Sequence, residues 1–264
     1  MSRHILRLGF ILVAVSLMTG SCGRKNDLPD DPLEALAAIN QNAKEIKSAH
    51  FTGSVIGIIE SEGKTENAGM IIDGDMVIKD GSKHIANMQM TVSALLSGQI
   101  TTVGMIVLDG KYWARYGSES WNQAPAELSP PMGNVDVPFV VIQYLEQAKN
   151  VKRLNDEIFN GVDCLHYGFT IDLKSLAEQS MPTPAVNAGQ QSDSLVKEFV
   201  ESGEVTSEVW ADKEHLFLRR QIIRVETLAD NLPESEADTL KIQAQMDWQY
   251  SKINEPIEIK APQN

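Results

Sequence analysis

Two cysteine thiols, Cys22 and Cys164, are the side chains of this sequence best suited to form a covalent bond. Cys164 stands two residues before His166 in an expected strand, so both side chains face the same side of it. This spacing could serve a thiolate nucleophile with an adjacent base. We favour the alternative, a buried cysteine beside a histidine whose ring is already hydrogen-bonded, because free cysteine is among the most buried residue types.

Other patterns typical of catalytic or metal sites are missing from the sequence. The histidines include no pair at the helical spacing of a zinc site. Asp73-Gly74-Asp75 resembles a fragment of a calcium loop, but the further acidic ligands and the closing glutamate are lacking, so we expect a turn or a bulge there. Gly-Xaa-Ser-Xaa-Gly and a phosphate-binding glycine loop are also absent. We therefore expect no metal, no cofactor and no enzymatic activity.

The first residues have the pattern of an export signal. Arg3 and Arg7 precede an apolar stretch from Leu8 to Met18, and small residues then lead to Cys22. The stretch has roughly a dozen residues, fewer than the roughly 20 that cross the hydrocarbon of a bilayer as a helix. We expect residues 1–21 to be a signal peptide that is removed.

The cysteine at the expected cut resembles the lipobox of bacterial lipoprotein signals. In such proteins the cysteine thiol receives a diacylglyceryl group, and the new amino end is then acylated, for example with palmitate. Cys22 is therefore the expected lipidation site. The alternative is an ordinary secretory signal with an incidental cysteine.

Charge limits the partners of the mature chain. Loss of Arg3 and Arg7 would leave 21 of the 23 basic residues against 36 acidic ones, so the formal charge would move from -13 to -15. Nucleic acid is disfavoured, because binding phosphates needs clustered Lys and Arg. Adhesion to an anionic lipid surface is disfavoured because the protein and the surface both carry negative charge, so membrane association must come from the lipid on Cys22.

The remaining chain divides into a tether and one domain. Residues 22–31 are polar and include a proline, and the part from Gly23 to Asp30 would reach about 16 Å as a flexible coil. Residues 32–264 show no change of composition that would indicate a second domain, and they are numerous enough to bury a core.

Strands dominate this domain. Runs rich in Val, Ile, Met, Thr and aromatic residues predict strands at Phe51–Glu60, Ala68–Lys79, Lys83–Val92, Gln99–Leu108, Lys111–Tyr116, Val151–Phe159, Val162–Asp172, Glu204–Ala211, Leu216–Leu228 and Thr239–Ser251. Asp80-Gly81, Asp109-Gly110 and Asn160-Gly161 are typical of tight hairpins.

Helical spacing of apolar residues occurs in a few segments. Asp31 can cap the first helix, and Pro32 suits its first position. The expected helices are Pro32–Ser48, Asp136–Lys149, Leu173–Gln179 and Ser194–Glu201, with a loop at Ser180–Asp193. A sheet of roughly ten strands is too wide to stay flat. The expected fold class is therefore α+β, a large curved antiparallel half-barrel with a few helices covering its concave face.

Several separated segments resemble the LppX/LprAFG group of cell-envelope lipoproteins, which share the LolA/LolB fold. These segments are Phe51–Ser54, Ile106–Trp113 with Trp121, Gly161–Tyr167, Val209–Asp212 with Leu218–Arg220, and Tyr250–Ile257 with Ala261 and Pro262. The resemblance spans nearly the whole mature chain. It implies a half-barrel whose apolar cavity holds the acyl chains of a lipid, lipoglycan or lipoprotein, for transfer or presentation at the envelope.

The candidate lining residues of that cavity come from the first strands and the second expected helix. They are Val55, Met70, Ile72, Met88, Met90, Val141 and Leu145. Methionine suits a cavity that accepts variable chains because it repacks easily. The alternative is that these residues fill a solid core, since periodicity groups residues on one face without showing which face is concave.

A second function remains open for the same fold. An envelope interaction or stress-sensing lipoprotein would bind a protein partner, through an exposed apolar patch with a polar rim. Either function implies an extracytoplasmic protein anchored to the cell membrane, or to the outer membrane if the host has one, because Gly23 is not the aspartate that favours retention at the inner membrane.

Overall fold

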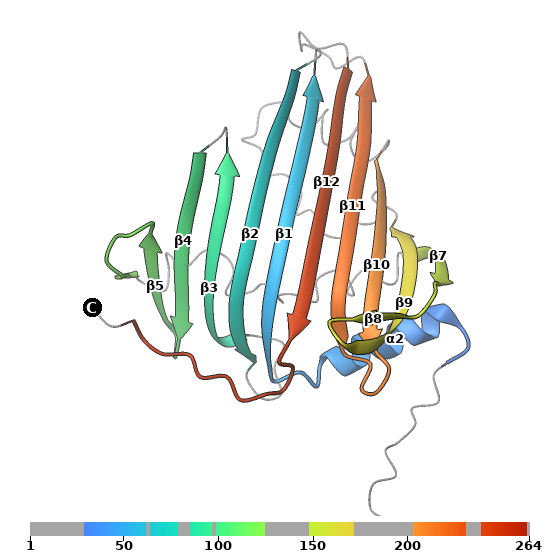
Figure 1. Ribbon diagram of the computed structural model, residues 1–264, viewed down its shortest axis with the longest axis horizontal. Helices are drawn as coiled ribbons and strands as arrows, with labels where there is room; N and C mark the ends of the chain where they lie inside the picture. Colours follow the sequence, from blue (N-terminus) through green and yellow to red (C-terminus); the bar gives the residue numbers. More distant parts are fainter. Residues whose placement is uncertain are drawn as a thin grey trace, which may run out of the picture.

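The chain forms one large antiparallel sheet. The computed structural model describes residues 29–61, 64–78, 85–96, 99–124, 148–171, 203–230 and 239–262. Twelve strands lie in the order β6-β5-β4-β3-β2-β1-β12-β11-β10-β9-β7, with β8 paired to β9. The sheet is not closed, and helix α2 lies at its lower end near β8 and β9 (Figure 1). This confirms the predicted α+β half-barrel, with two strands more than expected.

The elements have the following bounds. Helix α2 is Pro32–Ala43, and the strands are β1 Ser48–Ser61, β2 Lys64–Ile78, β3 Ile85–Leu96, β4 Gln99–Leu108, β5 Lys111–Tyr116, β6 Asn122–Ala124, β7 Ala148–Arg153, β8 Glu157–Phe159, β9 Val162–Ile171, β10 Glu204–Asp212, β11 Leu218–Asp230 and β12 Thr239–Ser251.

The first and the last long strands pair at the centre of the sheet. β1 and β12 run antiparallel from the pair His50 and Ser251 to the pair Ser61 and Leu240. On one side of this joint β1 to β6 follow each other in sequence order, and on the other side β12 to β9 do the same in reverse. The meander expected from the sequence is therefore present twice, and the two meanders are joined by the pairing of β1 with β12.

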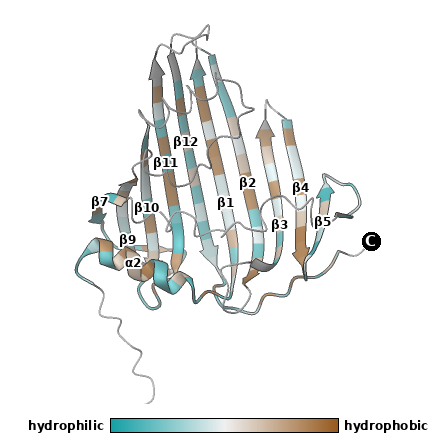
Figure 2. Cartoon of the chain, turned by 180° about the vertical axis from the view of Figure 1, so that it is seen from behind, coloured by the Kyte–Doolittle hydropathy of each residue, from teal (hydrophilic) through white to brown (hydrophobic). Residues whose placement is uncertain are grey.

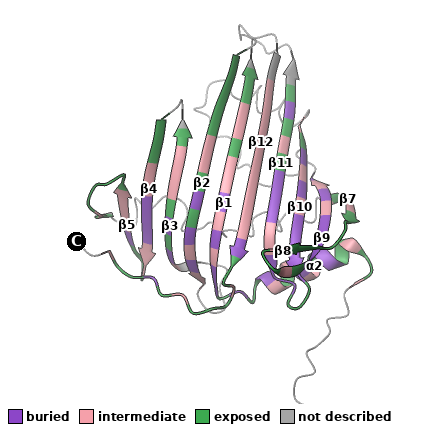
Figure 3. Ribbon diagram, viewed as in Figure 1, coloured by how far each residue is buried: buried purple, intermediate pink, exposed green. Residues whose placement is uncertain are grey.

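The two faces of the sheet differ in their burial. We call the inner face the one that carries Phe51, Met76 and Tyr250, because these side chains form the core together with Leu36 and Ile39 of α2. The opposite side is the outer face. Burial is greatest at the lower ends of the strands and falls toward the upper ends of β1 to β4 (Figure 3). The lower part of the inner face is therefore a packed core.

Helix α2 begins where the sequence predicts and ends earlier. Asp31 Oδ1 accepts hydrogen bonds from the backbone N–H of Leu33 at 2.8 Å and of Glu34 at 3.0 Å. The helix ends at Ala43 rather than at Ser48. Ile46 is buried, as the helical pattern predicted, although it lies beyond the helix. The helix ends early because the chain must change direction to enter β1 at Ser48.

Two of the three predicted hairpin turns lie in the described part of the chain. Asp109 and Gly110 have φ values of 50° and 73°, and Asn160 and Gly161 have 48° and 80°. Positive φ at both central residues defines the type I′ turn that matches the twist of a hairpin. Both predictions are confirmed, whereas Asp80-Gly81 lies outside the described residues.

Two other expectations were wrong, one strand was not expected, and four expected segments lie outside the described residues. Ala148 and Lys149 belong to β7 and not to the end of a helix, because they pair with Ile171 and Thr170 of β9. The expected strand Val151–Phe159 is divided between β7 and β8, and the short edge strand β6 was not foreseen. The segments 136–147, Leu173–Gln179, Ser180–Asp193 and Ser194–Glu201 lie outside the described residues.

Asp73-Gly74-Asp75 is neither a turn nor a bulge. The three residues pair without interruption with β1 and β3 inside strand β2. A Cβ atom on Gly74 would lie 2.8 Å from Cζ of Phe51 and 2.7 Å from both the Gln89 carbonyl oxygen and the Met90 Cβ. The glycine is therefore needed so that the Phe51 ring can pack against the backbone of β2.

The substitution Gly74→Ala is expected to destabilise the fold by about 1–3 kcal/mol, the usual cost of overpacking a core. Gly57→Ala is the matched control, because its nearest neighbour on the same face is the Ala68 carbonyl oxygen at 4.0 Å. Urea unfolding of both variants measures the difference. Equal midpoints for the two variants would contradict the packing role of Gly74.

Candidate functional site

A band of partly exposed apolar side chains extends the core up the inner face. We call it the apolar band, and it covers six neighbouring strands. Six of its members pack against the buried core: Met70, Val92, Val103, Val225, Met246 and Trp248. The seventh, Val55, is partly exposed and stands between Met70 and Met246 on the same face. Apolar and polar residues alternate along these strands (Figure 2), as expected for a sheet with two different faces. The apolar band is therefore a surface that a further apolar group could cover.

Pairing between strands makes the band continuous. Val55 stands opposite Met70 of β2 and opposite Met246 of β12, so the three side chains lie side by side on one face. Next to them, the ring of Trp248 lies over Gly53, where an added Cβ would come within 2.6 Å of the ring. Glycine at this position lets the indole lie flat on the sheet.

The five described candidate residues of the first strands occupy this same face. Val55 and Met70 belong to the apolar band. Ile72, Met88 and Met90 are 8%, 4% and 4% exposed and belong to the core beneath it. For these last three, burial agrees with the solid-core alternative. Ligand contact at Val55 and Met70 stays a prediction.

The other candidates lie outside the described residues. They are Cys22, Val141 and Leu145. Conversely, sequence reasoning missed Met246 and Trp248. Both alternate with Tyr250 along the expected strand Thr239–Ser251, and this alternation was the signal that could have grouped them with the core.

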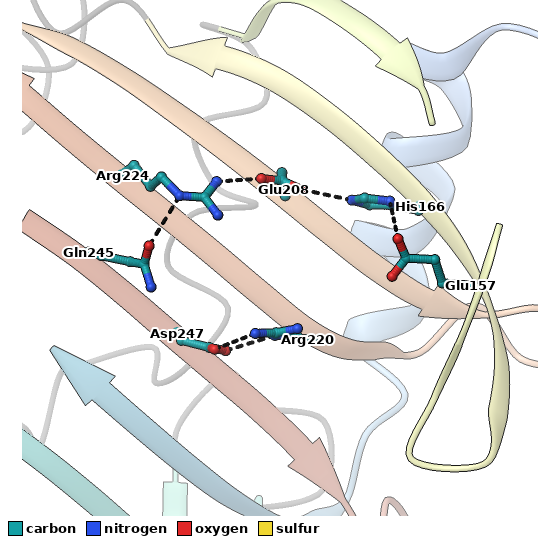
Figure 4. Close-up of polar contacts among 7 residues, drawn as sticks. All are labelled: Glu157, His166, Glu208, Arg220, Arg224, Gln245 and Asp247. Atoms are coloured by element: carbon teal, nitrogen blue, oxygen red, sulfur yellow. Dashed lines mark hydrogen bonds and ion pairs between the residues drawn. The ribbon is translucent and has the colours of Figure 1, made fainter. Parts of the chain in front are cut away.

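The outer face carries a chain of polar contacts across five strands (Figure 4). His166 Nε2 lies 3.0 Å from Glu208 Oε2, and His166 Nδ1 lies 3.6 Å from Glu157 Oε1. Arg224 donates to the other carboxylate oxygen of Glu208 and, through Nε, to Gln245 at 3.1 Å. One side chain each from β8, β9, β10, β11 and β12 takes part. The contacts therefore tie these strands together.

An aromatic and cationic stack lies beside this polar chain. The rings of His166 and Trp210 are stacked, with centroids 4.1 Å apart. The Arg220 guanidinium lies 5.1 Å from the Trp210 ring centroid and 5.4 Å from that of Phe159. Arg220 also donates to both carboxylate oxygens of Asp247 at 3.0 and 2.6 Å. The stack holds the short strand β8 against the outer face.

Cys164 lies within this outer-face cluster and is fully buried. Burial, and then the carboxylate of Asp212, raise the pKa of the Cys164 thiol. A raised pKa disfavours the thiolate that nucleophilic catalysis requires. His166 meanwhile contacts two carboxylates. This confirms the expectation of a buried cysteine beside a hydrogen-bonded histidine.

The contact between Glu208 and Arg224 predicts a dependence of stability on pH. Burial alone would raise the pKa of Glu208, but hydrogen bonds from Arg224 and His166 outweigh it and lower this pKa. A lowered pKa stabilises the fold above the ordinary glutamate value of about 4.3, and this contribution is lost as pH falls below it. Glu208→Gln removes this contribution. On acidification, the free energy of unfolding of the variant should therefore fall less than that of the parent chain, by on the order of 1 kcal/mol.

Urea unfolding at a series of pH values from neutral to acid measures this effect. Glu226→Gln is the control, because the Glu226 side chain is 64% exposed, whereas that of Glu208 is 27% exposed. An equal fall on acidification in Glu208→Gln and in the parent chain would contradict the assignment.

No group of three or more His, Cys, Asp or Glu side chains in the described ranges is arranged to hold a metal ion. In the same part of the chain, no helix combines the length and the apolar character needed to cross a membrane.

The chain is similar to known proteins in its fold and not in its sequence. No protein-family model and no curated protein sequence matches it. Among solved structures, LprF from Mycobacterium bovis is similar with a TM-score of 0.53 and 13% identity, over 88% of this chain and 97% of LprF. The lipoprotein LppX from Mycobacterium tuberculosis is similar with a TM-score of 0.48 and 14% identity, over 87% and 98%. The similarity to LprF shows that the chain has the LprF-type fold, as the sequence resemblance predicts.

Proposed function

We propose that this protein is an extracytoplasmic lipoprotein, anchored through Cys22, that binds acyl chains against the apolar band of its inner face. The bound molecule would be a lipid, a lipoglycan or a lipoprotein, held for transfer or presentation at the envelope. The observation that supports this most is the apolar band itself, which continues the core across six strands while remaining partly exposed.

The energetics of acyl-chain burial fit such a surface. Each methylene removed from water contributes about 0.8 kcal/mol, so ten buried methylenes contribute about 8 kcal/mol before the entropy lost on association. Few polar contacts are then needed for binding. Met70 and Met246 lie near the centre of the apolar band, and their flexible side chains can adapt to chains of different length.

The interaction function has one observation in its favour. Four exposed apolar side chains on the outer face, Ile56, Ile71, Leu95 and Ile100, occupy four neighbouring strands. A partner protein could cover them. We prefer the inner face, because its apolar band is continuous with the core.

Native mass spectrometry of a soluble form carrying Cys22→Ser tests the proposal, together with solvent extraction of the same sample. Co-purifying lipid with a mass that fits acyl chains is the expected result. A protein that is free of lipid, and that remains free after incubation with envelope lipid extract, would rule the proposal out.

A further inference from the structure

The inner face contains one polar pair among its apolar side chains. Gln221 of β11 and Ser207 of β10 are 0% and 1% exposed. Gln221 stands opposite Trp248 of β12 and Val209 of β10. Ser207 stands opposite Ile223. The cross-strand neighbours of the polar pair are therefore apolar, and the pair adjoins the apolar band at Trp248.

Hydrogen bonding within this pair is incomplete. Gln221 Nε2 donates to Ser207 Oγ over a long distance of 3.4 Å. Gln221 Oε1 is buried and has no hydrogen-bond partner among the described residues. An unpaired buried acceptor destabilises a protein by about 1–3 kcal/mol, and buried polar atoms are therefore nearly always paired. The amide oxygen thus lacks the hydrogen-bond donor that a buried acceptor ordinarily has.

Other buried polar side chains in the described part of the chain have more complete hydrogen bonding. Asp212, which is 2% exposed, accepts hydrogen bonds from His215 N and Arg219 Nε at 2.6 and 3.0 Å. The one comparable unpaired atom in the described ranges is Arg115 Nε, and its guanidinium lies 4.8 Å from the ring centroid of Trp121. Gln221 Oε1 is therefore the unpaired acceptor that adjoins the apolar band.

We propose that Gln221 Oε1 accepts a hydrogen bond from a neutral hydroxyl group of the bound lipid. This inference rests on the proposed function and narrows its ligand to acyl lipids with a free hydroxyl near the ester groups, of the diacylglycerol type. A charged headgroup is disfavoured at this position, because the side chains opposite Gln221 and Ser207 are apolar and would offer it no partner. The acyl chains then lie on the apolar band beside Trp248.

A matched pair of lipids tests this assignment on the soluble Cys22→Ser form. The probes are 1,2-dioleoylglycerol and its 3-acetyl ester, which differ in the hydroxyl donor. Affinities are measured by competition against a fluorescent fatty acid. The parent chain should bind the alcohol about three- to tenfold more tightly, the value of one net hydrogen bond.

Three variants complete the design. Gln221→Leu should bind both lipids with nearly equal affinity, and Ser207→Ala should reduce the preference by loosening the amide. Gln249→Leu is the control, because Gln249 lies on the outer face of β12, between Arg220 and Thr52. It should keep the full preference.

The outcomes separate this inference from the proposed function. Equal affinity of the parent chain for the two lipids would overturn the role of Gln221 while leaving lipid binding in place, and water would then be the partner of the amide. A preference that survives in Gln221→Leu would overturn it as well. Failure of the parent chain to bind either lipid, or the fluorescent fatty acid, would overturn the proposed function itself.

Discussion

Replacing Cys22 with serine is expected to move the protein from the membrane fraction almost entirely into the soluble fraction. The reason is that the thiol would carry the diacylglyceryl group, and a stable anchor needs two or more acyl chains. The acidic balance of the chain does not favour another attachment, because its formal charge of -13, and -15 after signal removal, opposes contact with anionic lipid. Membrane fractionation followed by immunoblotting measures the shift.

The other cysteine provides the control. Cys164→Ala keeps the expected lipidation site and should remain in the membrane fraction, although loss of a buried side chain lowers its stability. Mass spectrometry of the amino-terminal peptide should find acyl groups on Cys22 in this variant. A Cys22→Ser protein that stays in the membrane would show that another feature provides the anchor.

A negative charge on the apolar band is expected to abolish lipid binding. Met70→Glu places a carboxylate between Val55 and Ala94 on the inner face. An acyl chain that covered this carboxylate would remove it from water without a partner, which is strongly unfavourable. We expect at least a tenfold loss of affinity for a fluorescent fatty acid, with co-purifying lipid lost in parallel.

Ile71→Glu is the matched control for this experiment. Ile71 is the next residue of the same strand, is 64% exposed and points to the outer face. Its replacement should leave lipid binding unchanged. If Ile71→Glu lost lipid and Met70→Glu kept it, the binding surface would be the outer face and the proposed site would be wrong.

The expected position of the anchor constrains how the protein would work. The tether 22–31 leads directly into α2, which lies at the lower end of the sheet (Figure 1). If residues 23–30 form the coil expected from the sequence, they would reach about 16 Å, and an acylated protein would exchange its ligand beside the membrane that holds it. Such a protein would differ in this respect from an unanchored carrier.

Local features of the fold could be read from the sequence with good accuracy. The bounds expected for Gln99–Leu108, Lys111–Tyr116 and Thr239–Ser251 are those of β4, β5 and β12. Turn chemistry explains this success at β4 and β5, because Asp109-Gly110 both ends one strand and begins the next. The start of α2 was equally clear from Asp31 and Pro32, whose capping roles depend on neighbours in sequence.

Contacts between distant segments could not be predicted in the same way. The pairing of β1 with β12 joins residues that are about as far apart in sequence as the domain allows. Neither strand carries a local pattern that identifies the other as its partner. Tertiary context also overrode local pattern at Ile46, where an apolar position continued past the end of the helix, and at Ala148, where pairing with β9 replaced a helical stripe.

The sequence predicted which candidate residues share one face of the sheet, but not how exposed each of them is. Alternation correctly placed Val55, Met70 and Ile72 on one face, because side chains in a strand alternate strictly. It could not show that Ile72 is buried while Val55 and Met70 stay partly exposed, since that depends on how far the core extends up the sheet. Gln221 was missed because a glutamine in a strand is ordinarily expected on the polar face.

The most direct test of acyl-chain binding on the inner face is photo-crosslinking with a palmitic acid probe that carries a diazirine in its chain. The soluble Cys22→Ser form is loaded with the probe, irradiated and mapped by tandem mass spectrometry. The account predicts saturable adducts on the apolar band, at residues such as Val55, Met70 and Met246, that unlabelled lipid competes away. Adducts confined to outer-face residues such as Ile71 and Ile100, or no saturable labelling at all, would contradict it.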